Sequence, residues 1–254
     1  MVKTVNFDWH QLTNAPLRLM EPIEQEIFQV RLEQGIADVL RPLSQLYGQR
    51  DDFETWLAHF LEIVAKAYAK RPSDLKRLDQ KRLLTPDWFQ QPDMLGYVCY
   101  TDRFAGNLNG VAQKIEYLNE LGITYLHLMP LLQPRPEAND GGYAVMDYRA
   151  VNPALGTMDD LANLATELRH NGISLCIDLV CNHTAKEHAW AQKARAGDRD
   201  YQDYYLMFPD RTMPDAYEET LRDIFPDFKE GNFTYYEDLE KWVPNIQRHY
   251  IPHS

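Results

Sequence analysis

The stretch Ile173-Ser-Leu-Cys-Ile-Asp178-Leu-Val-Cys-Asn182-His183 joins an apolar run to three polar side chains that follow closely. Residues 173–178 predict a short buried strand, because the run is aliphatic and is preceded by the turn residues Asn171 and Gly172. Asp178 then lies at the carboxyl end of the strand. Since α/β proteins build their ligand sites at this edge of a parallel sheet, the stretch predicts an α/β fold with a polar site after the strand.

Two more strands and two helices precede this stretch in an alternating order. The strands are predicted over residues 95–100 and 124–129, and amphipathic helices over about 108–120 and 157–170. Residues 157–160 form a candidate capping box for the second helix. Alternating strands and helices indicate a parallel sheet covered by helices, but their spacing does not distinguish an open sheet from a barrel. Since none of the three strands is followed by the glycine spacing of a phosphate loop, nucleotide binding is not expected.

The residues before about position 90 have helical periodicity instead. A helix is predicted from about Phe53 to Tyr68, with Asp51 as its candidate cap, and an earlier helix is expected to end at Pro42. We therefore predict three domains. They are an N-terminal helical domain (1–90), the first β/α units of a larger domain (91–183), and a long aromatic-rich insertion with the chain end (184–254).

Composition excludes several classes of function. A net charge of −12 and a pI near 5.1 disfavour binding to nucleic acid or to anionic membranes. No secretory signal is visible at residues 1–9 and no apolar run approaches the roughly 20 residues of a membrane span, so a soluble, cytoplasmic protein is expected. Cys99, Cys176 and Cys181 are expected to be buried free thiols. No cofactor and no metal site are expected, because no ligand cluster has convincing spacing.

A second polar constellation, Asp140-Gly-Gly-Tyr143, lies in the loop after the second strand. The two glycines allow the backbone to approach closely, and Asp140 places a carboxylate beside the Tyr143 ring. Planar polar groups can hydrogen-bond the hydroxyls of a sugar while a ring covers its apolar face, so the two constellations together suit a pyranose. By spacing alone, a strand-end turn with a structural His183 remains an alternative.

These residues carry a resemblance to a known family. The Asp178–His183 stretch resembles the first signature block of the α-amylase family of glycoside hydrolases, and residues 140–157 resemble the loop and helix before it. Further motifs within residues 95–243 are similar to the amylosucrase and sucrose hydrolase subfamily: Asp102-Arg-Phe-Ala-Gly106, Thr124-Tyr-Leu-His-Leu-Met-Pro130-Leu, His188-Ala-Trp190-Ala, Phe208-Pro-Asp210-Arg, Met213-Pro-Asp215, Thr220-Leu-Arg222 and Ile224-Phe-Pro-Asp227.

The resemblance implies a (β/α)8 TIM barrel that cleaves sucrose with retention of configuration through a covalent glucosyl-enzyme. The glucosyl group then passes to an α-glucan acceptor or to water, and both outcomes stay open. By position, Asp140 and His183 would hydrogen-bond the glucosyl ring, Tyr143 would stack beneath it, and Arg222 would lie near the fructosyl or acceptor side. Asp178 and Asn182 would support these groups.

The sequence departs from the family after Thr184. The family's nucleophilic aspartate follows the fourth barrel strand and its acid glutamate the fifth, and neither strand is predicted here. We therefore expect no catalytic residue in the chain, and poor stability or dependence on a missing half, because three strands cannot close a barrel. A frameshift or premature stop near codon 244 is a hypothesis that the downstream DNA would test. A non-catalytic sugar-binding or non-functional fragment is the alternative to a sucrose-using enzyme.

Overall fold

The computed structural model describes residues 17–18, 20–137, 139–221 and 231–244. The chain separates into two compact units, Met1–Trp88 and Phe89–Ser254. Each unit is described by itself below. The finer division at residues 90 and 183 stays a prediction.

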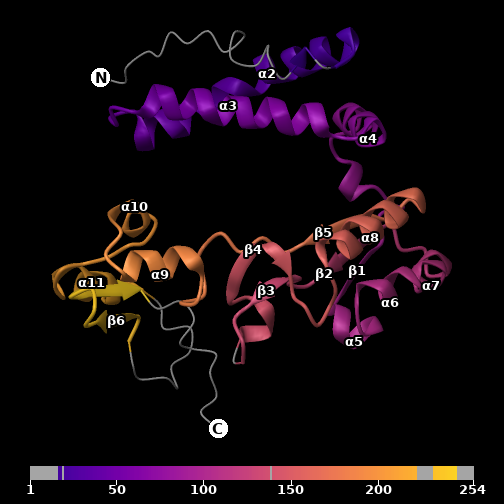
Figure 1. Cartoon of the computed structure of the whole chain (residues 1–254). Coiled ribbons are helices and arrows are strands. Elements are labelled where there is room, and N and C mark those ends of the chain that lie inside the picture. The colour runs from indigo at the N-terminus through magenta and orange to yellow at the C-terminus, as the bar shows by residue number, and fades with distance from the viewer. Residues whose placement is uncertain (1–16, 19, 138, 222–230, 245–254) are drawn as a thin grey trace. The chain divides into compact units, whose positions relative to one another are not determined.

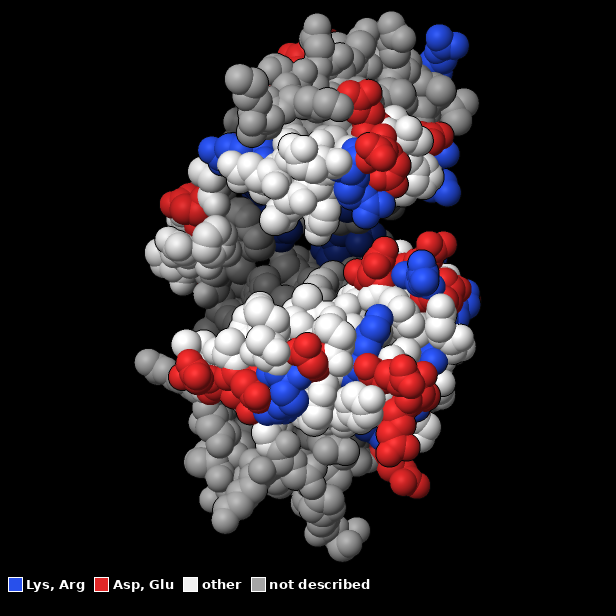
Figure 2. All heavy atoms as spheres, turned by 90° about the vertical axis from the view of Figure 1, so that its left-hand side faces the viewer, with Lys and Arg blue, Asp and Glu red and all other residues white. Residues whose placement is uncertain are grey.

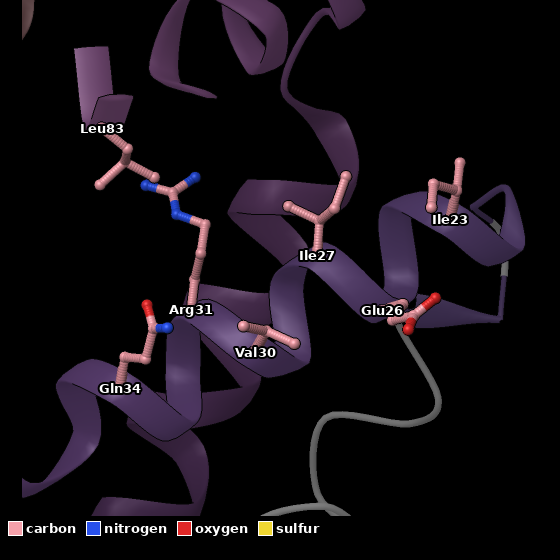
Figure 3. Close-up of a pocket in the computed structure, with 7 residues that line it drawn as sticks. All are labelled: Ile23, Glu26, Ile27, Val30, Arg31, Gln34 and Leu83. Atoms are coloured by element: carbon pink, nitrogen blue, oxygen red, sulfur yellow. The ribbon is translucent and has the colours of Figure 1, made fainter. Parts of the chain in front are cut away.

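The first unit is helical, with α2 (Pro22–Tyr47), α3 (Phe53–Lys70) and α4 (Ser73–Leu84), followed by a single turn, η1 (Trp88–Gln90), at the boundary (Figure 1). Ile36 of α2 and Leu57 and Leu61 of α3 are buried in one cluster. Asp52 rather than Asp51 precedes α3, and its side chain makes no capping bond. A surface pocket of this unit is lined by six residues of α2 and by Leu83 of α4 (Figure 3).

The prediction that the first helix ends at Pro42 was wrong. Helix α2 continues through Pro42 to Tyr47. A proline inside a helix removes one backbone hydrogen bond and costs about 3 kcal/mol in an isolated helix. Here Leu40 and Leu43, on both sides of Pro42, pack against the buried cluster that includes Leu57. The packing of α2 against α3 therefore outweighs the tendency of proline to end a helix.

The second unit contains the three predicted strands, β1 (Gly96–Cys99), β2 (Tyr125–Leu128) and β5 (Ser174–Ile177), as a parallel sheet in the order β1-β2-β5. Between β1 and β2 the chain forms α5 (Thr101–Ala105), α6 (Leu108–Ala112) and α7 (Ile115–Glu120), so the one helix predicted over 108–120 is two short ones. Helix α8 (Met158–His170) precedes β5 and packs beside the sheet with α6 (Figure 1).

The predicted capping box at the start of α8 is confirmed. The Thr157 hydroxyl accepts from the Asp160 N–H, and the Asp160 carboxylate accepts from the Thr157 N–H at 2.8 Å. The bonds from the Thr157 hydroxyl and N–H and from the Asn109 amide hold the pKa of Asp160 below its ordinary 3.8. A carboxyl with a depressed pKa stabilises the fold above pH 3.8, and this contribution is lost as the pH falls through the folded-state pKa.

We expect Thr157→Ala to lower the free energy of unfolding of the second unit by about 1 kcal/mol at pH 7, because the helix loses its N-cap. The difference from the wild type should shrink below pH 3.8 as Asp160 is protonated. Denaturant unfolding followed by circular dichroism at both pH values measures it. Thr166→Ala, at a half-buried position in the interior of α8, is the control and should not destabilise the unit. An equal loss in both variants would refute the capping role.

Two antiparallel hairpins complete the second unit. The first, β3 (Leu132–Pro134) with β4 (Val145–Val151), encloses the turn η2 (Asp140–Gly142). After β5 come the short helices α9 (Ala189–Arg195), α10 (Arg199–Gln202) and α11 (Thr212–Glu218). The second hairpin, β6 (Phe233–Tyr236) with β7 (Lys241–Pro244), forms its own sheet and does not extend the parallel one. Within the described residues, β1 and β5 are therefore the outer strands of the parallel sheet.

The cysteines differ from expectation. All three are free, but Cys99 and Cys176 are only half-buried and Cys181 is exposed. Cys176 is a strand neighbour of His127, on the sheet face away from the helices, and Cys181 lies in the loop after β5. The prediction of buried thiols was therefore wrong, because it treated the apolar run as covered on both faces.

Charge is mixed on the surface. On the face drawn in Figure 2, acidic side chains lie among lysines and arginines. In the part of the chain that the structure describes, no helix combines the length and the apolar character needed to cross a bilayer.

Candidate functional site

The site begins with the two faces of the parallel sheet. Leu126 and Leu128 of β2 are fully buried in the core that α6 and α8 cover. Because side chains alternate along a strand, His127 points to the opposite face, in register with Val98 and Cys176. Continuing this register by two residues brings Tyr100 and Asp178 to the same face at the carboxyl edge of the sheet. Polar groups thus gather where the sequence predicted a site.

The Asp140 loop is held in shape by its own backbone. The Asn139 side chain accepts a hydrogen bond from the Gly142 N–H at 3.1 Å, and Asp140 itself has a φ of +55°. A non-glycine residue in this region carries backbone strain, which tends to occur at functional positions. Gly141 has a φ of +63°, and a Cβ there would lie 2.8 Å from the Tyr100 hydroxyl. The second position of the turn therefore requires glycine.

The loop after β5 is attached to the β3–β4 hairpin, which lies between the parallel sheet and α9 in Figure 1. The Tyr148 hydroxyl lies 2.6 Å from the Val180 carbonyl and 3.1 Å from the His183 carbonyl, and the Ala185 N–H donates to the Val145 carbonyl at 2.8 Å. Val180 is also buried against Val145. These contacts bring the Asp140 loop and His183 to one place.

Two polar contacts join the predicted residues, and a third adds His127 to them. The Tyr143 hydroxyl donates to Asp178 Oδ2 at 3.4 Å, and His127 Nε2 lies 3.3 Å from the same oxygen. His183 Nε2 lies 3.2 Å from the Tyr143 carbonyl. Because a carbonyl only accepts, this Nε2 carries the proton. Nδ1 is buried without a hydrogen-bond partner among the described residues.

The electrostatics of the site favour a neutral, hydroxyl-rich ligand. Burial raises the pKa of the Asp140 carboxyl, and the charge of His183 acts in the opposite direction. Burial and, after it, the Asp178 carboxylate raise the pKa of the Tyr143 hydroxyl above its ordinary 10.0. Tyr143 therefore stays protonated at neutral pH and donates to Asp178. The arrangement offers carboxylate acceptors, an imidazole and an aromatic ring within one small area.

The structure brings some of the predicted site residues together and leaves others apart or undescribed. Asp140, Tyr143, His183 and Asp178 are brought together, whereas Asn182 lies exposed in the loop after β5. Arg222 lies outside the described residues.

Sequence reasoning missed His127 and Tyr100. The signal for His127 was present, because a polar residue between two leucines in a predicted strand must face away from the leucine side. Among the described residues, no cluster of three or more histidine, cysteine or acidic side chains could hold a metal ion. The pocket of the helical unit has no aromatic ring in its lining, unlike the candidate site.

Comparison with known proteins indicates the family of the chain. The α-amylase catalytic domain matches residues 74–243. The chain is 42% identical over 106 residues to the α-amylase SusG of Bacteroides thetaiotaomicron, covering 41% of this chain and 15% of SusG. It is 39% identical over 102 residues to an oligo-1,6-glucosidase of a Bacillus species, covering 40% and 20%. The chain thus spans a fifth or less of these two relatives.

Solved structures agree with the sequence matches. A variant of MutB crystallised in complex with glucose superposes with a TM-score of 0.51 at 25% identity, over 63% of this chain and 29% of that protein. The family match covers more than half of the chain and includes both loops of the candidate site. This chain belongs to the α-amylase family of glycoside hydrolases and related transferases, as part of its catalytic domain.

Proposed function

We propose that this chain carries the glucosyl-recognition part of a sucrose-acting enzyme. The observation that carries the proposal is the convergence of Asp140, Tyr143 and His183 at the carboxyl edge of a parallel sheet. In it, Asp140 and His183 hydrogen-bond the hydroxyls of the glucosyl ring, and the Tyr143 ring covers its apolar face. A MutB variant of related fold was crystallised in complex with glucose, which supports a glucosyl ligand.

The finer assignment to sucrose rests on the similarity of several motifs to amylosucrase and the sucrose hydrolases. In this proposal the whole enzyme transfers the glucosyl group of sucrose to an α-glucan, as in amylosucrase, and hydrolysis of sucrose is the alternative. Arg222 is assigned to the fructosyl or acceptor side. The three free thiols support a cytoplasmic location, because a reducing compartment keeps thiols free.

The proposal assigns sugar binding, and not bond cleavage, to this chain. Retaining cleavage needs two carboxyl groups about 5 Å apart, one as nucleophile and one as acid and base. By comparison with the family's pattern, both belong after strands that follow β5 in a complete barrel. The chain alone is therefore expected to bind glucose and sucrose without releasing fructose.

Isothermal titration of the purified chain with glucose and with sucrose, beside an assay for released fructose, tests the proposal. Saturable binding of both sugars without fructose release is the expected result. Mannitol is the control, because it has similar hydroxyl groups but no ring to lie on Tyr143. Equal binding of mannitol, or no glucose binding by a folded chain, would refute glucosyl recognition. Released fructose would instead show that the chain holds both reacting carboxyl groups.

A further inference from the structure

His127 is the polar side chain of β2, and neither of the two sequence constellations includes it. It lies in the middle strand of the parallel sheet, between β1 and β5, on the face away from the helices. Its Nε2 atom is buried and has no aligned hydrogen bond to any residue that the structure describes, although it lies 3.3 Å from Asp178 Oδ2. A buried imidazole nitrogen this close to a carboxylate is one small adjustment away from a charge-assisted hydrogen bond.

Asp178 connects His127 to the sugar-facing residues. The same Oδ2 atom that lies beside His127 accepts from the Tyr143 hydroxyl at 3.4 Å. The Tyr143 carbonyl in turn holds the His183 ring at 3.2 Å. The contacts thus run from the middle of the sheet through one carboxylate to the ring and the imidazole of the proposed glucosyl site.

A packing role alone does not explain His127. The neighbouring leucines of β2 are fully buried in the apolar core, whereas His127 is on the other face, where its cross-strand neighbour Val98 is 60% exposed. His127 therefore does not belong to the apolar core between the sheet and the helices. The contact with Asp178 is the feature that distinguishes this position.

We propose that His127 is a positioning residue of the glucosyl site: it holds the Asp178 carboxylate, which in turn fixes the Tyr143 ring for stacking on the sugar. The inference rests on the proposed function for the identity of the ligand, but the effect on Tyr143 does not require a ligand. His127→Leu removes the donor, and His127→Gln keeps an N–H at the place of Nε2. Tyr143→Phe identifies the Tyr143 signal in protein that carries 13C-labelled tyrosine.

The first measurement is made without sugar. The Tyr143 ring resonance is expected to shift or broaden in His127→Leu and to return toward its wild-type position in His127→Gln. In Asp178→Asn, the 15N resonances of the His127 imidazole are expected to move. An unmoved Tyr143 signal in His127→Leu, or an unmoved His127 signal in Asp178→Asn, would overturn the proposal. If His127→Leu does not fold, the Asp178→Asn spectrum alone decides it.

The second measurement is glucose titration of the same proteins. His127→Leu is expected to weaken glucose binding about tenfold, and His127→Gln to remain within about threefold of the wild type, because it keeps the donor. In an Asp178→Asn background, His127→Leu should add little, because the two residues act through one contact. A fully additive loss would show an independent packing role and overturn the proposal. If Tyr143 responds but even the wild type does not bind glucose, the proposed function fails and the positioning role stands.

Discussion

Replacing Leu126 with alanine is expected to lower the free energy of unfolding of the second unit by about 3 kcal/mol. Leu126 lies in the middle strand of the parallel sheet and is fully buried. It belongs to the core cluster that α6 and α8 close, together with Leu164 and Leu168. Removing its side chain loses the hydrophobic transfer energy and leaves a cavity. Because β2 is paired with a strand on each edge, it cannot move to fill this cavity.

Hydrogen–deuterium exchange distinguishes this loss from unfolding of the helical unit. Amides of β2 and α8 should exchange faster in Leu126→Ala, whereas those of α3 should keep their wild-type rates. Leu179→Ala is the matched control, because this leucine is 68% exposed and its loss should change stability by less than about 0.5 kcal/mol. Equal effects of the two substitutions would show that the sheet and its helices do not form the core described above.

Asp140→Asn is expected to weaken glucose binding by about 10- to 100-fold, because a hydrogen bond from a sugar hydroxyl to a carboxylate contributes about 1.5–3 kcal/mol. Asparagine is the substitution of choice. Asp140 has a φ of +55°, a conformation that asparagine tolerates well, so the loop is kept while the charge is removed. Titration calorimetry with glucose measures the effect.

The same substitution should not destabilise the protein at neutral pH. Burial raises the pKa of Asp140, so its protonated form is the one that folding favours. This contribution is present below the ordinary pKa of 3.8 and is lost as the pH rises through the folded-state value. At pH 7 the ionised carboxylate therefore costs stability, and its neutral replacement should unfold at an equal or higher temperature.

The control for Asp140→Asn is Asp102→Asn, which removes the same charge at an exposed position of α5. It should leave glucose binding unchanged. An unchanged affinity in Asp140→Asn, or a parallel loss in both variants, would contradict direct contact between Asp140 and the sugar. A lower melting temperature in Asp140→Asn at pH 7 would contradict the account of its burial.

The three strands of the parallel sheet could be predicted from the sequence, because each strand is a short apolar run beside a strong helix signal. Their order in the sheet could not, because spacing along the chain does not distinguish an open sheet from a barrel. The capping box at the start of α8 was predicted from the sequence, since it is a purely local pattern. The end of α2 was not predicted correctly, because it depends on packing against α3 and no local sequence pattern indicates that contact. The break between α6 and α7 was not predicted either, because the helical periodicity of the apolar residues continues through both helices.

In the candidate site, too, the sequence predicted the residues that lie in local motifs and missed those that depend on tertiary structure. Asp140, Tyr143 and His183 were found because each lies in a motif of polar residues after a strand. Tyr100 was missed because a single residue at the end of a strand has no motif of its own. The place of His127 between two leucines indicates the face of the sheet on which it lies, but not its partner. Their part in the site depends on the register of three strands, which brings together residues from positions 100, 127 and 178.

The contacts of the candidate site have a kinetic consequence. Three of its bonds join partners 32 to 40 residues apart, namely Tyr148 with Val180, Tyr143 with Asp178 and His183 with Tyr143. Short loops close at low entropic cost and contacts of low order form early in folding. On a ribosome, these contacts can therefore form once residues to about Ala185 have left the exit tunnel.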